Sequence, residues 1–153
     1  GKGYVILFQL DEADLRRALA HPRVMIGSDG SSLAVTGPLS EGKPHPRLYG
    51  TFARVLGRYA REEKLFSMAE AVHRMTGFAA AKFGLQDRGV IRAGACADLV
   101  LFDPATIIDR GTFDDPKRAP EGIRAVFVNG ALAVDGGKVT GVRTGRVLRR
   151  SRG

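Results

Sequence analysis

The sequence predicts an α/β fold whose second half changes to β structure. Residues 4–9 and 23–28 are predicted strands, the second with a short apolar run that ends in Ser28-Asp29-Gly30, and the segment between them has the spacing of a helix. Two strands joined by a crossover helix with short links form a parallel pair. From Asp87 onward, short apolar runs separated by turn signals replace the helical periodicity.

Composition narrows the class of protein. The 153 residues are 44% hydrophobic and 26% charged, which is typical of a globular domain with a real core. No apolar run is long enough to cross a bilayer, so no membrane partner is expected. The net charge of +8 comes without a helix-turn-helix, zinc-finger or aromatic RNA-binding signature, which argues against nucleic acid. The single cysteine and the lack of a signal peptide favour a cytoplasmic setting.

The first half contains the predicted parallel pair. Asp11 is a suitable N-cap for a helix that ends at His21-Pro22. The second strand then leads into Ser28-Asp29-Gly30 and a long loop, residues 30–47, rich in Gly, Ser and Pro. The chain starts at Gly1 and enters a strand almost at once, so we expect a piece of a longer protein.

Helices follow the loop. One is predicted over residues 52–63, with Phe52, Val55, Leu56 and Tyr59 on one apolar face. A capping box at Ser67 opens the next, and a short helical piece over 78–83 ends at Gly84.

The last part is predicted to be a small β-module. Strands are expected at 89–94, 97–104 and 146–148, with a hairpin of 126–128 and 132–134 around Asn129-Gly130. Cys96 is expected to be a small buried residue, because no metal-site spacing surrounds it.

Asp29 is the first candidate for chemistry. A carboxylate at the carboxyl end of a buried strand is where α/β barrels place catalytic groups, and it can ligate a metal or transfer a proton. Gly27 and Gly30 on either side allow a tight turn. The alternative is that Asp29 simply starts a turn, as Asp-Gly commonly does.

His45 and Arg47 are the second candidate pair. Two prolines, Pro44 and Pro46, stiffen the end of the long loop around His45, which suits a loop that holds polar groups in place. The alternatives are a loop histidine that caps a backbone group and a surface cation.

These motifs resemble a known family. The order of Gly27-Ser28-Asp29-Gly30, the loop motif 44–52, Met75-Thr76-Gly77, Gly94-x-x-Ala97-Asp98-Leu99-Val100 and Val128-Asn129-Gly130 is similar to the D-aminoacylase (N-acyl-D-amino-acid deacylase) branch of the metal-dependent amidohydrolases. The loop motif is much more specific to the deacylases than the 94–103 stretch.

The resemblance implies a fold and a reaction. Residues 1–85 would supply the last strands and helices of a (β/α)₈ barrel, residues 86–150 the C-terminal part of a small β-sandwich, and residues 151–153 a tail. Asp29 would take a proton from a zinc-bound water, return it to the leaving amine, and serve as a candidate metal ligand. Arg47 would bind the carboxylate of an N-acyl-D-amino acid, with help from His45.

The family's His-x-His strand, bridging cysteine and two later zinc histidines have no counterpart here. The resemblance therefore implies a zinc enzyme whose other ligands lie in a missing N-terminal barrel segment, so that the chain is inactive by itself. Two alternatives stay open. One is a non-catalytic binding or assembly module on an amidohydrolase-derived scaffold, and the other is a neighbouring amidohydrolase branch with a different amide substrate.

Overall fold

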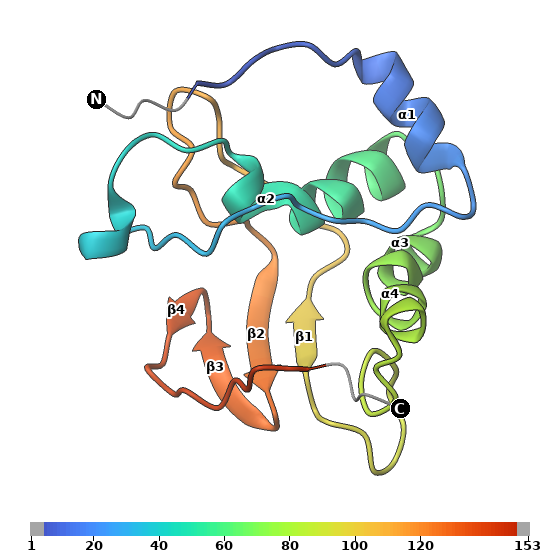
Figure 1. Cartoon of the computed structure of the whole chain (residues 1–153), viewed down its shortest axis with the longest axis vertical. Helices are drawn as coiled ribbons and strands as arrows, with labels where there is room; N and C mark the ends of the chain where they lie inside the picture. The colour runs from blue at the N-terminus through green and yellow to red at the C-terminus, as the bar shows by residue number, and fades with distance from the viewer. Residues whose placement is uncertain (1–4, 150–153) are drawn as a thin grey trace.

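The structure is a computed structural model, and it describes residues 5–149. Helices fill the first part of the chain and an antiparallel sheet the second (Figure 1). In chain order the elements are α1 (Glu12–Ala20), the 3₁₀ turn η1 (Pro38–Ser40), α2 (Arg47–Arg54), the π-helix η2 (Val55–Glu62), α3 (Met68–Met75), α4 (Gly77–Phe83), β1 (Leu99–Phe102), β2 (Ile123–Val128), β3 (Ala131–Asp135) and β4 (Lys138–Val139). None of these helices is long and apolar enough to cross a membrane.

Local capping sets the limits of α1, α3 and α4 as the sequence predicts. The Asp11 carboxylate accepts a hydrogen bond from the Ala13 N–H, and α1 ends before His21-Pro22. The Ser67 hydroxyl accepts from the Glu70 N–H at the start of α3. Gly84 ends α4 in the left-handed conformation that glycine adopts without a Cβ penalty.

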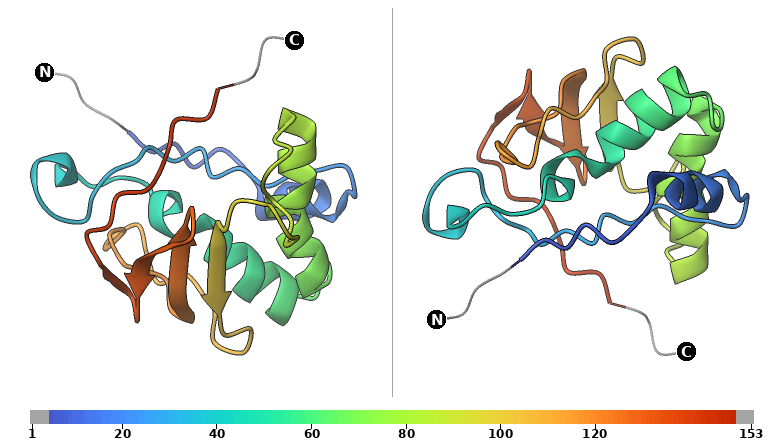
Figure 2. Two further views of the ribbon diagram at one scale, coloured as in Figure 1. Left: turned by 90° about the horizontal axis from the view of Figure 1, so that it is seen from below. Right: turned by 90° about the horizontal axis from the view of Figure 1, so that it is seen from above.

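The predicted helix over 52–63 begins five residues earlier and changes its winding. Its α-helical turns start at Arg47, and they widen into a π-helix from Val55 onward. The two parts, α2 and η2, form one continuous rod beside the sheet in both views of Figure 2, and residues 47–62 are called the helix rod below. The start shifts because the His45 ring accepts a hydrogen bond from the Arg47 N–H, one of the free donors of the first turn. Phe52 is half-exposed, whereas the other residues of the predicted apolar face are buried.

One hydrophobic core joins the helices to the β part of the chain. Leu19 of α1, Leu56 and Tyr59 of η2 and Ala71 of α3 are buried in it. Ile107, from the connection between β1 and β2, belongs to the same cluster and is nearly inaccessible to solvent. This connection leaves the sheet beside α2 and turns toward the N-terminal segment (Figure 1).

The sheet has the order β1-β2-β3-β4, and every pairing in it is antiparallel. The predicted hairpin is confirmed: Asn129 and Gly130 both have positive φ, the geometry of a type I′ turn. The Asp98 carboxylate accepts from the Asn129 N–H at 2.7 Å and also pairs with Arg88, which fixes the entry to β1 on the hairpin. Cys96 lies beside this pair and is half-buried, not buried as predicted.

The predicted parallel pair is wrong for the part of the chain that the structure describes. Residues 5–10 and 23–28 form no strand there, and residue 4 lies outside it. A strand of a parallel sheet is covered on both faces, whereas Val5, Leu7 and Phe8 are exposed here, Val5 at 79%. The strands predicted at 89–94 and 146–148 are also absent, and the predicted tail 151–153 lies outside the described residues.

Candidate active site

Asp29 and Arg47, two residues that the sequence predicts as site residues, lie in direct contact. The Arg47 Nη2 atom is 2.7 Å from the Asp29 Oδ2 atom, and the Arg47 Nε–H donates to the Asp29 backbone oxygen at 3.1 Å. Arg47 is the first residue of α2, so the helix rod carries one partner and the segment after α1 carries the other. The Asp29 side chain is 86% exposed and can be reached from solvent.

The backbone around Asp29 is held in an uncommon conformation. Asp29 has a φ of 48°, in the left-handed region, which Asp tolerates better than most residues. The Ser28 hydroxyl accepts from the Gly30 N–H at 3.2 Å and closes the turn. A Cβ on Gly30 would lie 3.2 Å from the Leu48 Cα, so this glycine lets the turn approach α2 closely. Gly27 has open space around it, and its predicted role in the turn is not required.

His45 contacts the backbone of Arg47 and the ring of Phe113. Its Nδ1 atom accepts from the Arg47 backbone N–H at 3.0 Å, and its ring meets the edge of Phe113 with centroids 5.0 Å apart. Burial lowers the pKa of His45 below its ordinary value, and the Arg47 charge lowers it further. Both effects favour the neutral imidazole, the form in which Nδ1 can accept a hydrogen bond.

The described residues do not fit a zinc site by themselves. A zinc ion in a protein takes three or four His, Cys or carboxylate ligands, and between residues 5 and 149 no three such residues are grouped to hold a metal. Asp29 offers one carboxylate. His73 stacks on Phe78, and the Cys96 thiol donates to the Asp87 carboxylate at 3.1 Å.

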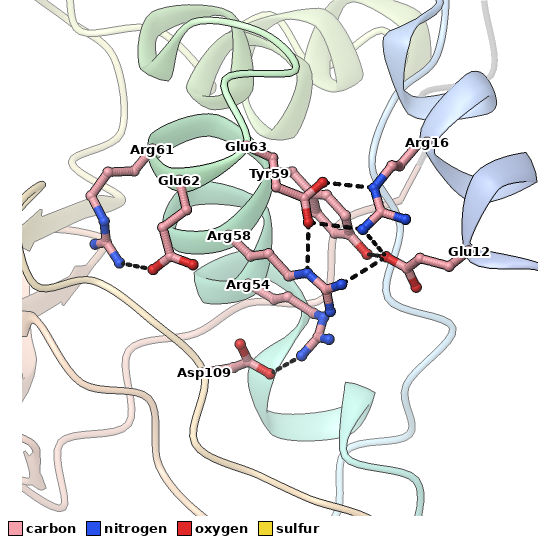
Figure 3. Close-up of polar contacts among 9 residues, drawn as sticks. All are labelled: Glu12, Arg16, Arg54, Arg58, Tyr59, Arg61, Glu62, Glu63 and Asp109. Atoms are coloured by element: carbon pink, nitrogen blue, oxygen red, sulfur yellow. Dashed lines mark hydrogen bonds and ion pairs between the residues drawn. The ribbon is translucent and has the colours of Figure 1, made fainter.

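An ion-pair cluster ties α1 to the helix rod (Figure 3). The Glu63 carboxylate accepts from Arg16 Nε at 2.8 Å and from Arg58 Nε at 2.9 Å. These two guanidinium groups, Arg16 first, lower the pKa of Glu63 to about 2. The Tyr59 hydroxyl donates to Glu12 at 2.8 Å in the same cluster. The cluster fixes α1, from which the chain leads to Asp29.

Sequence reasoning did not identify the contribution of Phe113 and Asp109. Phe113 begins a stretch, residues 113–120, that the sequence predicts only as irregular, yet its ring touches His45. Asp109 precedes this stretch and accepts from Arg54 Nη1 at 2.8 Å (Figure 3). No local pattern marks them, because their contacts join segments about 55 to 70 residues apart. The one available signal was a large aromatic residue within a loop rich in Gly, Asp and Pro.

Comparison with known proteins places this chain in a family. The profile described as the Amidohydrolase family matches residues 8–134. A D-aminoacylase from Alcaligenes xylosoxydans xylosoxydans is 51% identical over 146 residues, which cover 95% of this chain and 29% of that protein. An N-acyl-D-aspartate deacylase from the same organism is 46% identical, over 94% of this chain and 27% of that protein.

Solved structures agree. A D-aminoacylase crystal structure, described as defining a novel subset of amidohydrolases, superimposes with a TM-score of 0.86 at 49% identity, covering 94% of this chain and 29% of that one. An N-acyl-D-glutamate deacylase from Bordetella bronchiseptica, complexed with zinc and a phosphonate inhibitor that mimics the tetrahedral intermediate, gives 0.73 at 47% identity, covering 83% and 26%.

The chain spans less than a third of the length of these relatives. The similarity extends over nearly all of the chain in both sequence and structure. Because the family profile covers most of the 153 residues, the chain belongs to the Amidohydrolase family.

Proposed function

We propose that this chain is part of a zinc-dependent hydrolase that cleaves the amide bond of N-acyl-D-amino acids, giving a carboxylate and a free D-amino acid. The observation that supports the proposal is the contact between Asp29 and Arg47. A carboxylate can transfer a proton, and a guanidinium can bind the carboxylate of a substrate. The deacylase relatives, at 46–51% identity, support the same substrate class.

In this proposal Asp29 moves the proton. The attacking water gives a proton to the Asp29 carboxylate as its oxygen bonds to the acyl carbon. The same proton then passes to the amine nitrogen as the carbon–nitrogen bond breaks. The exposure of the Asp29 side chain supports this role, because substrate and water need direct access to the carboxylate.

Arg47 binds the carboxylate of the D-amino acid part. A guanidinium presents two parallel N–H groups that match a carboxylate. In this structure the Arg47 Nη2 faces Asp29, so a substrate carboxylate that takes this donor also loosens the contact with Asp29. Substrate binding would then free the carboxylate that transfers the proton. His45 supports the arrangement by holding the backbone of Arg47.

In this proposal, a complete metal site and a closed barrel require residues beyond this chain. We propose that residues 1–85 form part of a (β/α)₈ barrel and residues 86–150 part of a β-sandwich, with the zinc ligands in a further barrel segment. The exposed apolar side chains of residues 5–10 support such a neighbour, since it would cover them. Two related structures support a metal in the intact enzyme. One is a D-aminoacylase with a binuclear metal centre, and the other is the zinc-bound N-acyl-D-glutamate deacylase.

The test is Asp29→Asn in the intact enzyme. Asparagine tolerates positive φ, so the turn survives while the proton-transferring group is lost. We expect hydrolysis of N-acyl-D-amino acids to fall by about 10²-fold or more, with metal content unchanged by elemental analysis. Near-normal turnover in this variant would reject the role of Asp29, and no turnover in the unmodified enzyme would favour a binding module instead.

A further inference from the structure

The loop of residues 109–118, part of the connection between β1 and β2, packs against the start of the helix rod. Its first residue, Asp109, accepts from Arg54 Nη1 at 2.8 Å, and its side chain is largely buried. Gly50 of α2 packs directly against it: a Cβ at Gly50 would lie only 2.7 Å from the Asp109 Cβ. The base of the loop is therefore fixed on α2, a few residues from Arg47.

The far end of the loop is fixed on the segment that precedes α2. The Lys43 Nζ lies 3.6 Å from the Asp114 carboxylate, and the Lys117 Nζ donates to the Ser40 backbone oxygen. Gly111 approaches Pro46 so closely that a Cβ there would lie 3.3 Å from the proline ring. The 109–118 loop thus follows residues 40–46 along their length.

The loop also holds its own shape. The Thr112 N–H donates to the Asp115 backbone oxygen at 3.0 Å, and the Asp115 N–H donates to the Thr112 hydroxyl at 2.9 Å. Pro116 is buried next to this turn. A loop braced in this way can hold a side chain in one position instead of following the motion of its neighbours.

Phe113 is the side chain that the loop presents to the candidate active site. Its ring contacts the ring of His45 edge to face, at 5.0 Å and 81°, and it contacts Phe8 in a similar way at 4.7 Å. His45 in turn accepts from the Arg47 N–H at 3.0 Å. A continuous series of contacts therefore runs from Phe113 through His45 to the backbone of Arg47.

We propose that Phe113 is a positioning residue for Arg47 in the hydrolysis reaction. The inference rests on the proposed function, because it assigns Arg47 to the substrate carboxylate. Phe113 keeps the His45 ring in the orientation that fixes the Arg47 backbone, so the guanidinium starts from a defined place at the head of α2. Phe113 acts through His45, and Asp29 remains the group that transfers the proton in the proposed reaction.

The test compares two substrates of the intact enzyme. N-acetyl-D-alanine carries the carboxylate that Arg47 would bind, and N-ethylacetamide is the same amide without it. Phe113→Ala should raise the KM for N-acetyl-D-alanine by roughly threefold to tenfold, the size of an aromatic edge contact, and leave kcat near its normal value. The kcat/KM for N-ethylacetamide should stay unchanged. Phe113→Tyr, which keeps the ring, should restore the normal KM.

Phe83→Ala is the matched control, because Phe83 is an exposed phenylalanine on α4 (69% exposed, against 45% for Phe113) with no part in this series of contacts. A change in kcat/KM that is equal for both substrates would show that Phe113 only stabilises the fold and would overturn the inference. An unchanged KM would overturn it as well.

A measurement of binding separates this inference from the proposed function. Calorimetric titration of N-acetyl-D-alanine into intact Asp29→Asn enzyme needs no turnover, and adding Phe113→Ala should weaken the Kd by the same roughly threefold to tenfold. An equal Kd with and without Phe113→Ala rejects the positioning role even if hydrolysis is confirmed. Weakened binding without any hydrolysis in the unmodified enzyme rejects the reaction and retains the positioning role.

Discussion

Arg47 holds Asp29 at two separate groups: its Nη2 atom lies 2.7 Å from the carboxylate, and its Nε–H donates to the backbone oxygen at 3.1 Å. The second contact fixes the turn itself and does not depend on the charge of Asp29. In the proposed reaction, this second contact keeps the Asp29 turn against α2 while the Arg47 Nη2 atom moves from Asp29 to a substrate carboxylate.

Arg47→Ala in the intact enzyme should weaken substrate binding. The loss of charge-assisted hydrogen bonds to a carboxylate corresponds to a rise in KM of about 10- to 100-fold. The KM of Arg47→Lys should lie between that of Arg47→Ala and that of the normal enzyme, since an ammonium keeps the charge but not the paired donors. Steady-state kinetics measures both. Arg143→Ala, an exposed site in the C-terminal part, is the control for net charge. Equal KM values in all three variants would contradict the role of Arg47.

The loss of the Glu63 charge in acid should make the protein less stable. Its pKa is about 2 in the folded chain, below the ordinary 4.5, because Arg16 and Arg58 donate hydrogen bonds to it. The stabilisation by Glu63 is therefore fully present above pH 4.5 and is lost as the pH falls from 4.5 toward 2. Thermal unfolding across this range should show a smaller loss of Tm in Glu63→Gln than in the unmodified protein.

The control for Glu63 is Glu41→Gln, which removes an exposed carboxylate outside the ion-pair cluster. This variant should keep the full loss of Tm in acid. If Glu63→Gln and Glu41→Gln show the same dependence on pH, the Arg16 and Arg58 contacts do not act on Glu63 in solution.

Arg74 should be a main contributor to stability. It is 3% exposed, donates to the Leu19 backbone oxygen at 2.5 Å and to the Glu70 carboxylate at 2.7 Å, and lies over the Phe66 ring. Arg74→Met leaves these acceptors without a partner, so we expect a loss of about 2–3 kcal/mol in the free energy of unfolding. Denaturant unfolding measures it. Arg17→Met, which removes an exposed pair with Asp14, should change stability by less than about 0.5 kcal/mol.

Gly57 should not tolerate a side chain. A Cβ there would lie 2.3 Å from the Ile107 backbone oxygen, so η2 and the β1–β2 connection would have to move apart. Gly57→Ala should therefore destabilise the protein by about 1–3 kcal/mol, although alanine is the better helix former. Gly145→Ala, where the added Cβ meets nothing within 4 Å, should show no such loss. Equal melting temperatures for the two variants would contradict this close packing.

The limits of α1, α3 and α4 and the hairpin turn follow from local chemistry, which explains why the sequence predicts them. Asp11, Ser67 and Gly84 act within a few residues of their own position, and the Asn129-Gly130 turn needs only its own two positive φ values. Asp29 and Arg47 are predicted as site residues from motifs along the chain and from the family that these motifs resemble.

Only the tertiary structure decides which distant segments meet. Residues 5–10 have the composition of a strand, but a strand exists only where a neighbour accepts its backbone hydrogen bonds, and the described residues provide none for them. In the same way, nothing in the local sequence shows that Phe113 meets His45 or that Arg47 meets Asp29. These contacts depend on how the helix rod and the sheet pack around Ile107, and such packing is a property of the whole chain.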